Sequence, residues 1–285
     1  DYVELGMSKI NKEGWRALEK ATRAERVRMM LEELGPTFIK LGQLLSTHRD
    51  ILPEDIISKL EHLQDDVPPF PFTEAKRIVE EELNASLEDI FEGFDEEPLA
   101  AASIAQVHCA TLPGGEEAVV KVRRPKIEAM VEVDLEIIRH IAGLMEKHIE
   151  GWDVQSPTRI VDEFNRIINQ ELDFNHEAAQ QEHFAGDMHG INMAHVPTVY
   201  SDYCGRRVLT MEYVDGTKPS SADALRAVGL DPVCIAKRGY NLLMKQVFTH
   251  GFFHGDPHPG NILVLPDNVI GYIDFGMMGE LSRRE

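Results

Sequence analysis

The sequence lacks a basic surplus, paired cysteines and long apolar runs, and each absence excludes a class of protein. Its 285 residues hold 29 Lys and Arg against 49 Asp and Glu, a net charge of −20. Nucleic-acid binding relies on clustered Lys and Arg, so no nucleic-acid partner is expected. No stretch approaches the roughly 18 apolar residues of a membrane span. What remains is an acidic chain of ordinary globular composition.

Three cysteines, Cys109, Cys204 and Cys234, lie far apart in the sequence. They form neither a metal-binding nor a redox spacing, and an odd number cannot close a disulfide framework. We therefore expect three free thiols in a reducing compartment. The chain begins Asp1-Tyr2 rather than with Met or a signal peptide, so we expect an excerpt of a longer protein.

Apolar periodicity divides the chain at the proline cluster of residues 67–71. Helices are predicted before it at 24–34, 37–47 and 53–63, and after it at 73–83, 86–91, 125–148, 157–184, 222–228 and 232–250. Strands are predicted at 103–112, 117–123, 198–200, 207–213, 262–265 and 269–274, with a loop over 251–261. Helices and strands are segregated rather than alternating, which predicts an α+β fold.

The most specific segment is His254-Gly-Asp-Pro-His-Pro-Gly-Asn261, followed thirteen residues later by Asp274-Phe275-Gly276. This order resembles the catalytic loop and metal-binding motif of protein kinases. Phosphoryl transfer needs a carboxylate near the attacking oxygen and hard oxygen ligands for Mg²⁺. We assign Asp256 as catalytic base or orienting group, and Asn261 and Asp274 as metal ligands.

Two other interpretations of this loop are weaker. A turn-rich surface loop would use the same residue types, but it would not explain the Asp274 motif at this spacing. A metal site built from His254 and His258 would need a helix, which Pro257 and Pro259 prevent. His254 is better interpreted as a packing and hydrogen-bonding residue that holds the loop.

Upstream, Ala118-Val-Val-Lys121 is a strand that ends in lysine and resembles the phosphate-binding strand of kinases. A lysine at such a place is often only a surface residue. A phosphate-binding lysine should pair with a carboxylate from a nearby helix, and Glu171 and Glu177 are the candidates. Met211-Glu212-Tyr213-Val214 resembles a kinase hinge, with Met211 gating the adenine site and Glu212 and Val214 beside it.

No glycine-rich loop precedes Lys121. An alanine-rich segment takes its place, made of Leu99, Ala100, Ala101, Ala102, Ser103, Ile104, Ala105, Gln106 and Val107. With Lys40-Leu-Gly-Gln43 and Glu171-Leu-Asp173, this segment makes the chain similar to the UbiB family of atypical kinases, the AarF-domain proteins. The resemblance extends over nearly all of residues 25–280.

The resemblance implies a bilobal protein-kinase-like fold that binds ATP or ADP with Mg²⁺. Lys121 would pair with Glu177 and hold the phosphates, and the alanine segment would replace the glycine loop. Because alanine restricts the backbone more than glycine does, this loop should alter nucleotide preference and disfavour ordinary phosphotransfer. Lys40 and Gln43 would form a lid that meets Glu171 or Asp173 and blocks protein substrates.

The expected domains are a helical extension (1–67), a kinase-like N-lobe with inserted helices (68–213) and a truncated C-lobe (214–285). The family implies a role in ubiquinone or related isoprenoid-lipid biosynthesis, with a quinone or lipid precursor as partner. It also implies a place on the cytoplasmic side of a membrane, such as the bacterial inner membrane, reached through regions outside this chain.

Three alternatives stay open. A small-molecule phosphotransferase of the aminoglycoside-kinase type has a nearly identical catalytic loop but no Lys40–Gln43 segment. A non-catalytic nucleotide-binding module would not need the carboxylates that are present. An autophosphorylating protein kinase is disfavoured by the alanine segment and the expected lid.

Overall fold

The computed structural model describes residues 21–47, 52–63, 67–148 and 156–281. The chain forms two compact units. The first comprises residues 1–68, 101–104 and 126–168, and the second comprises 69–100, 105–125 and 169–285. Lys121, Asp256, Asn261 and Asp274 all belong to the second unit.

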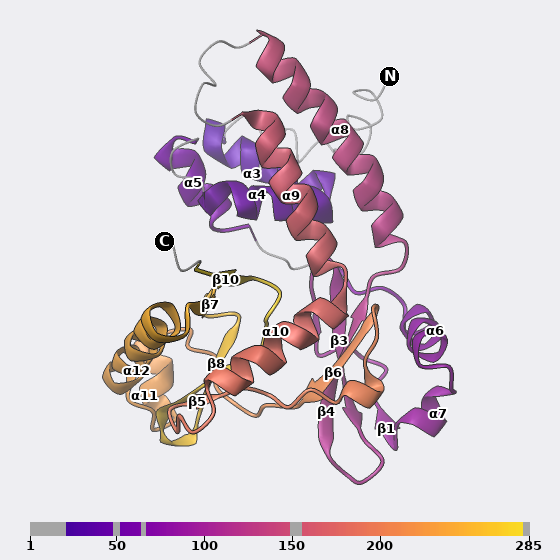
Figure 1. Ribbon diagram of the computed structural model, residues 1–285, viewed down its shortest axis with the longest axis vertical. Helices are drawn as coiled ribbons and strands as arrows, with labels where there is room; N and C mark the ends of the chain where they lie inside the picture. Colours follow the sequence, from indigo (N-terminus) through magenta and orange to yellow (C-terminus); the bar gives the residue numbers. More distant parts are fainter. Residues whose placement is uncertain (1–20, 48–51, 64–66, 149–155, 282–285) are drawn as a thin grey trace. The chain divides into compact units, whose positions relative to one another are not determined.

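The first unit is helical (Figure 1). Its helices are α3 (Arg23–Leu34), α4 (Pro36–Thr47), α5 (Glu54–Leu60), α8 (Ile127–His148) and most of α9 (Pro157–Glu171). Thr22 and Glu25 form a capping box that starts α3, and Gly35 ends it at a φ of 107°. On α4, the Thr37 hydroxyl donates a 2.5 Å hydrogen bond to Asp134 of α8.

Gly42 lets α4 approach its neighbours in this unit. A Cβ at this position would lie 2.8 Å from Leu31 Cδ1 and would also overlap Leu63. Its presence inside a helix, where glycine costs roughly 1 kcal/mol relative to alanine, therefore has a packing cause.

The second unit begins with an antiparallel sheet in the order β1-β3-β4-β6, with β2 paired to β3. Its strands are β1 (Gly93–Phe94), β3 (Ala105–Thr111), β4 (Glu117–Arg123) and β6 (Val208–Glu212), while β2 (Ala100–Ala101) contributes only Ala100 to this unit. Helices α6 (Phe72–Leu83) and α7 (Leu87–Ile90) pack on one face, where Val120 and Val122 are buried. Because side chains alternate along a strand, Lys121 points to the opposite face, where it contacts Glu177 of α10 (Phe174–Asp187).

The rest of this unit combines helices with short strands. These are β5 (Ala194–His195), α11 (Ala222–Ala227), α12 (Pro232–Lys245), β7 (Phe252–His254), β8 (Ile262–Leu265), β9 (Val269–Tyr272) and β10 (Met278–Glu280). β8 and β9 are antiparallel, β5 joins β9 in parallel, and β7 pairs with β10. A core that includes Phe184, Leu242, Tyr272 and Phe275 lies beneath them.

Four predicted elements are wrong in extent or type. The helix predicted over 157–184 is two helices, because Asp173 leaves helical geometry and caps α10 by accepting from the Asn175 amide. The helix predicted over 232–250 changes into a π-helical turn at Gln246–His250 and ends at Gly251 with a φ of 70°. The loop predicted over 251–261 contains β7, and residues 198–200 contribute only a bridge from Val199 to Met211.

Among the residues that the structure describes, no helix has both the length and the apolar composition needed to cross a bilayer. Cys109, Cys204 and Cys234 are all free thiols, as the sequence predicts.

Candidate functional site

Three segments of the second unit meet around the ammonium group of Lys121. Its Nζ lies 2.8 Å from both carboxylate oxygens of Glu177 and 3.3 Å from Asp274 Oδ2. Glu177 comes from α10 and Asp274 from the segment after β9. Of the two glutamates that the sequence left open, Glu177 is therefore the one paired with Lys121.

Burial makes this three-residue cluster electrostatically strong. The exposed fraction of the side chain is 11% for Lys121 and 5% for Glu177, whereas Asp274 is 40% exposed. Burial alone would lower the pKa of Lys121, but Asp274 and Glu177 outweigh it and raise that pKa. Burial also raises the pKa of Glu177, against the opposing effect of Lys121. One cation between two carboxylates leaves an excess negative charge on the side open to solvent.

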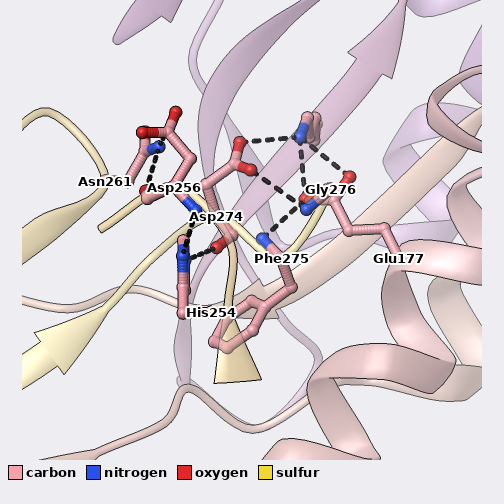
Figure 2. Close-up of polar contacts among 8 residues, drawn as sticks. Glu177, His254, Asp256, Asn261, Asp274, Phe275 and Gly276 are labelled. Atoms are coloured by element: carbon pink, nitrogen blue, oxygen red, sulfur yellow. Dashed lines mark hydrogen bonds and ion pairs between the residues drawn. The ribbon is translucent and has the colours of Figure 1, made fainter. Parts of the chain in front are cut away.

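Two hydrogen bonds and the packing of one ring hold the Asp274-Phe275-Gly276 segment in place. Asp274 Oδ1 accepts from the Gly276 amide at 3.0 Å, and the Phe275 amide donates to Glu177 at 3.5 Å (Figure 2). The Phe275 ring is fully buried, with its centroid 5.7 Å from that of Phe184. Packing of Phe275 therefore sets the direction in which Asp274 points.

His254 connects this segment to the catalytic loop (Figure 2). Its Nε2 lies 2.7 Å from the Asp274 carbonyl oxygen, and its Nδ1 is 3.2 Å from the Asp256 amide. Burial lowers the pKa of His254, which favours the neutral ring. A carbonyl can only accept and an amide N–H can only donate, so the proton resides on Nε2. His254 thus holds the loop, as the sequence predicts.

Asp256 and Asn261 lie together in the exposed loop after β7. The Asn261 Nδ2 group donates to Asp256 Oδ2 at 3.2 Å and to its carbonyl oxygen at 3.1 Å (Figure 2). These bonds use the nitrogen end of the amide, which leaves its oxygen end for a cation. With Asp274, this gives hard oxygen donors of the kind that Mg²⁺ prefers.

Protein groups alone would not complete a metal site. Within the described residues, no cluster of three or more His, Cys, Asp and Glu side chains is arranged to hold a metal ion. An amide and a carboxylate suit an ion that takes its other ligands from phosphate and water. The donor set at Asn261 and Asp274 therefore fits a metal that arrives with a nucleotide.

The predicted hinge lies at the end of β6. Met211 is buried and pairs with Val119 of β4. The Glu212 amide donates to Thr198, and its carboxylate accepts from the Thr198 amide and contacts His195 Nε2 at 3.0 Å. In contrast, the Val214 amide has no partner among the described residues, so it is free for a ligand.

The predicted lid residues are divided between the units. Lys40 and Gln43 lie on α4 of the first unit, where Gln43 Nε2 donates to the Leu63 carbonyl oxygen at 3.5 Å. Glu171 and Asp173 belong to the second unit, where Asp173 caps α10 and lies 3.9 Å from the Arg206 guanidinium. The expected approach of Lys40 and Gln43 to Glu171 or Asp173 stays a prediction.

The alanine segment is also divided. Leu99 and Ala100 belong to the second unit, where the Leu99 amide donates to Val107 at 2.8 Å. Ala101, Ala102, Ser103 and Ile104 belong to the first, and Ala105, Gln106 and Val107 lie on β3. Gln106 is buried and bonded to the Phe70 amide and to His108. It is therefore part of the sheet's interior, and its predicted nucleotide contact is untested.

Comparison with known proteins decides the family. Residues 62–285 match the ABC1 atypical kinase-like domain. The chain belongs to the ABC1 atypical kinase-like family. The resemblance to UbiB proteins predicted from the sequence is thereby confirmed.

Curated relatives of this ABC1 chain are about 40% identical. "Probable protein kinase UbiB" of Marinobacter nauticus is 40% identical over 267 residues, which cover 92% of this chain and 49% of that protein. "ACTIVITY OF BC1 COMPLEX KINASE 7, chloroplastic" of Arabidopsis thaliana is 43% identical over 93% of this chain and 38% of its own length. The chain therefore spans half or less of the length of these two relatives.

A solved structure supports the fold class of the ABC1 chain. "The complex structure of Rv3197-erythromycin from Mycobacterium tuberculosis" is similar with a TM-score of 0.64 at 28% identity. The similarity covers 95% of this chain and 68% of that one. The prediction of an α+β, kinase-like fold is confirmed.

Three supporting residues of the ABC1 site were not found from the sequence. The Phe174 ring lies 5.4 Å from Lys121 Nζ, and the buried Arg123 guanidinium donates to the Leu172 carbonyl oxygen. Buried Gln246 accepts from the His254 amide and donates to the Tyr272 hydroxyl. Arg123 could have been found by strand alternation from Lys121, but no sequence signal marks Gln246.

Proposed function

We propose that this ABC1-family chain binds ATP or ADP with Mg²⁺ and catalyses phosphoryl transfer or ATP hydrolysis. The observation that carries the proposal is the contact of Lys121 with both Glu177 and Asp274. A lysine held by one buried carboxylate and one partly exposed carboxylate can exchange the second partner for a phosphate. Lys121 would then face the phosphates while Glu177 keeps it in place.

Each polar residue of the site has a distinct task in this proposal. Asp274 and Asn261 would hold the metal, which neutralises charge on the triphosphate. Asp256 is exposed at the loop, so its carboxylate can accept the proton of an attacking hydroxyl or water as the new oxygen–phosphorus bond forms, while the bond from the γ-phosphorus to the bridging oxygen breaks and ADP leaves. His254 fixes the Asp256 backbone and so positions this carboxylate.

The adenine would lie beside the hinge. Met211 would line the site, with Glu212 next to it, and the free amide of Val214 would donate to the base. The segment from Leu99 to Val107 would cover the phosphates. Lys40 and Gln43 would approach Glu171 or Asp173 and restrict access of protein substrates.

The biological setting belongs to the same proposal. UbiB-named relatives favour a quinone or isoprenoid-lipid precursor as the physiological partner. A place at the cytoplasmic side of a bacterial inner membrane would depend on regions outside this chain. The ABC1 family match favours this function over the aminoglycoside-kinase type.

Nucleotide titration with and without Mg²⁺ tests the proposal. We expect ATP binding that strengthens with Mg²⁺, and loss of that strengthening in Asp274→Asn. Asp267→Asn is the matched control, because Asp267 is an exposed turn residue and asparagine tolerates its φ of 59°. Nucleotide affinity that ignores both Mg²⁺ and Asp274→Asn would contradict the proposal.

A further inference from the structure

Both carboxylate oxygens of Glu212, in the hinge, are engaged by protein groups. Its Oε1 lies 3.0 Å from His195 Nε2, and its Oε2 accepts from the Thr198 amide at 3.0 Å. A carboxylate oxygen accepts, so the proton on the neutral His195 ring resides on Nε2. The Glu212 amide in turn donates to the Thr198 carbonyl oxygen at 2.9 Å. The Glu212 side chain is therefore committed to holding the hinge rather than to contacting a ligand.

The segment of residues 195–198, which we call the hinge brace, is also anchored to two other elements. His195 pairs with Gly271 of β9 in parallel register. The carbonyl oxygen of Pro197 accepts at 2.7 Å from Gln181, a fully buried residue of α10. The hinge brace therefore connects the end of β6 to β9 and to α10.

The two anchoring elements both carry residues of the phosphate end of the site. On α10, Glu177 lies four residues before Gln181, which is about one helical turn. β9 ends at Tyr272 and leads directly to Asp274. Lys121 contacts both Glu177 and Asp274. The hinge brace thus sets where the hinge lies relative to the groups that would hold the phosphates.

The same strand β9 lies against Val214. A Cβ built on Gly271 would come within 3.5 Å of Val214 Cγ1, which is ordinary van der Waals contact. Gly271 is also the residue paired with His195. The Val214 amide, which has no partner among the described residues, therefore lies beside a strand and two residues after a glutamate that the hinge brace both hold in place.

A fixed amide distinguishes between the two purine bases. An N–H group can only donate. Atom N1 of adenine is an acceptor, whereas N1 of guanine carries a hydrogen and is a donor. Guanine in the same position would set donor against donor and leave both groups unpaired, which a mobile hinge could relieve and a fixed hinge cannot. The selectivity of such a site therefore depends on how firmly its hinge is held.

We propose that His195 is a positioning residue for nucleobase selectivity, which holds the hinge through Glu212 so that the Val214 amide favours adenine over guanine. This inference deepens the proposed nucleotide binding and rests on it. His195 acts through Glu212 and has no assigned contact with the nucleotide.

Titration of the full 285-residue chain with ATP and with GTP, both with Mg²⁺, tests the proposal. The measured quantity is the ratio of the dissociation constant for GTP to that for ATP. We expect this ratio to fall about tenfold in His195→Leu, which removes the hydrogen bond to Glu212. His195→Gln should keep the ratio within about twofold, because its amide N–H reaches the place of Nε2. His189→Leu is the matched control, since His189 is exposed in the turn after α10.

Hydrogen exchange at the Thr198 amide gives a readout that needs no nucleotide. Because this amide donates to Glu212, we expect it to exchange faster in His195→Leu than in His195→Gln. Equal exchange rates in the two variants would show that His195 does not hold Glu212, and would overturn the proposal.

The outcomes of the titration separate this proposal from the proposed function. An unchanged ratio in His195→Leu, or an equal loss of ATP and GTP affinity, would overturn the role of His195 while nucleotide binding itself stands. Binding of neither nucleotide by the unaltered chain would overturn both. If His195→Leu does not fold, His195→Asn takes its place, because its side chain is too short to reach Glu212.

Discussion

The two halves of the candidate site differ in how firmly the protein holds them. Glu177 is buried and Lys121 is largely so, with 11% of its side chain exposed; two contacts of 2.8 Å join them, and the amide of the buried Phe275 donates to Glu177. Asp256 and Asn261 lie in an exposed loop and are held mainly by each other and by His254. The difference suggests a division of labour. A buried ion cluster fixes the charge that binds phosphate, while an exposed carboxylate is free to meet a substrate.

Asp256→Asn should give the largest effect and show that the exposed half serves chemistry alone. Removing a catalytic base typically lowers turnover by about 10²–10⁴-fold. Stability should change by less than about 0.5 kcal/mol, because the side chain is exposed and the amide keeps its size. Nucleotide turnover and urea unfolding of the same preparations measure the two effects. A loss of Mg-nucleotide binding as large as the loss of turnover would contradict the proposed division between binding and chemistry. Asp267→Asn, at another exposed aspartate, is the matched control.

Lys121→Met should affect both binding and stability, because it leaves two carboxylates beside a buried apolar chain. We expect loss of nucleotide binding and a decrease of about 3 kcal/mol in the free energy of unfolding at pH 7. The loss of stability should be smaller at pH 5, since burial raises the pKa of Glu177 and the uncompensated carboxyl can take up a proton.

Urea unfolding at the two pH values measures the Lys121→Met effect. Lys237→Met is the control, because Lys237 is exposed on α12. A stability loss that is the same in both variants would show that the buried ion pair contributes nothing of its own.

Gln246→Met should weaken the connection between the two halves. The variant leaves the buried His254 amide without its acceptor, which costs about 1–3 kcal/mol. Because His254 positions Asp256, turnover should fall while Mg-nucleotide affinity is retained. Unfolding and turnover are measured for Gln246→Met and for the control Asn241→Met, which lies at an exposed position of α12. The control shows how much stability and turnover are lost merely by introducing a methionine on this helix.

The pH dependence of stability should give the smallest effect. Burial lowers the pKa of both His254 and His108, so the folded chain resists protonation where the unfolded chain accepts it. The effect of these two histidines on stability is therefore constant above the unfolded pKa of about 6.5 and becomes unfavourable as the pH falls below it. The slope is at most about 1.4 kcal/mol per pH unit for each histidine.

Unfolding at pH 5.5–7 measures this slope for the unaltered chain and for His254→Asn. We expect a shallower slope in His254→Asn and an unchanged slope in His189→Asn, because His189 is exposed. Equal slopes in all three would mean that His254 takes up protons equally in both states.

Local signals predicted most of the helices and strands but not where they break. The run over 157–184 has apolar spacing on both sides of Asp173, so only the capping bond to Asn175 shows that two helices meet there. In the π-helical turn at Gln246–His250, the Gln246 side chain bonds to both the His254 amide and the Tyr272 hydroxyl. Both partners lie outside α12. Helix propensity depends on the residues of the helix itself, so it does not predict these two hydrogen bonds.

The sequence by itself determined the residue types of the site, their order and the family, because a motif needs particular groups at particular spacings. Strand alternation and helical period also set which side chains share a face. Only the tertiary structure decided that Lys121 meets Glu177 and not Glu171, across 56 residues, and Asp274 across 153. It likewise decided that His254 is buried, which lowers the pKa of its ring, and that Met130, Ile137 and Leu144 of α8 are exposed. The physical reason is that packing of distant segments sets burial and neighbours, and these set charge state and availability.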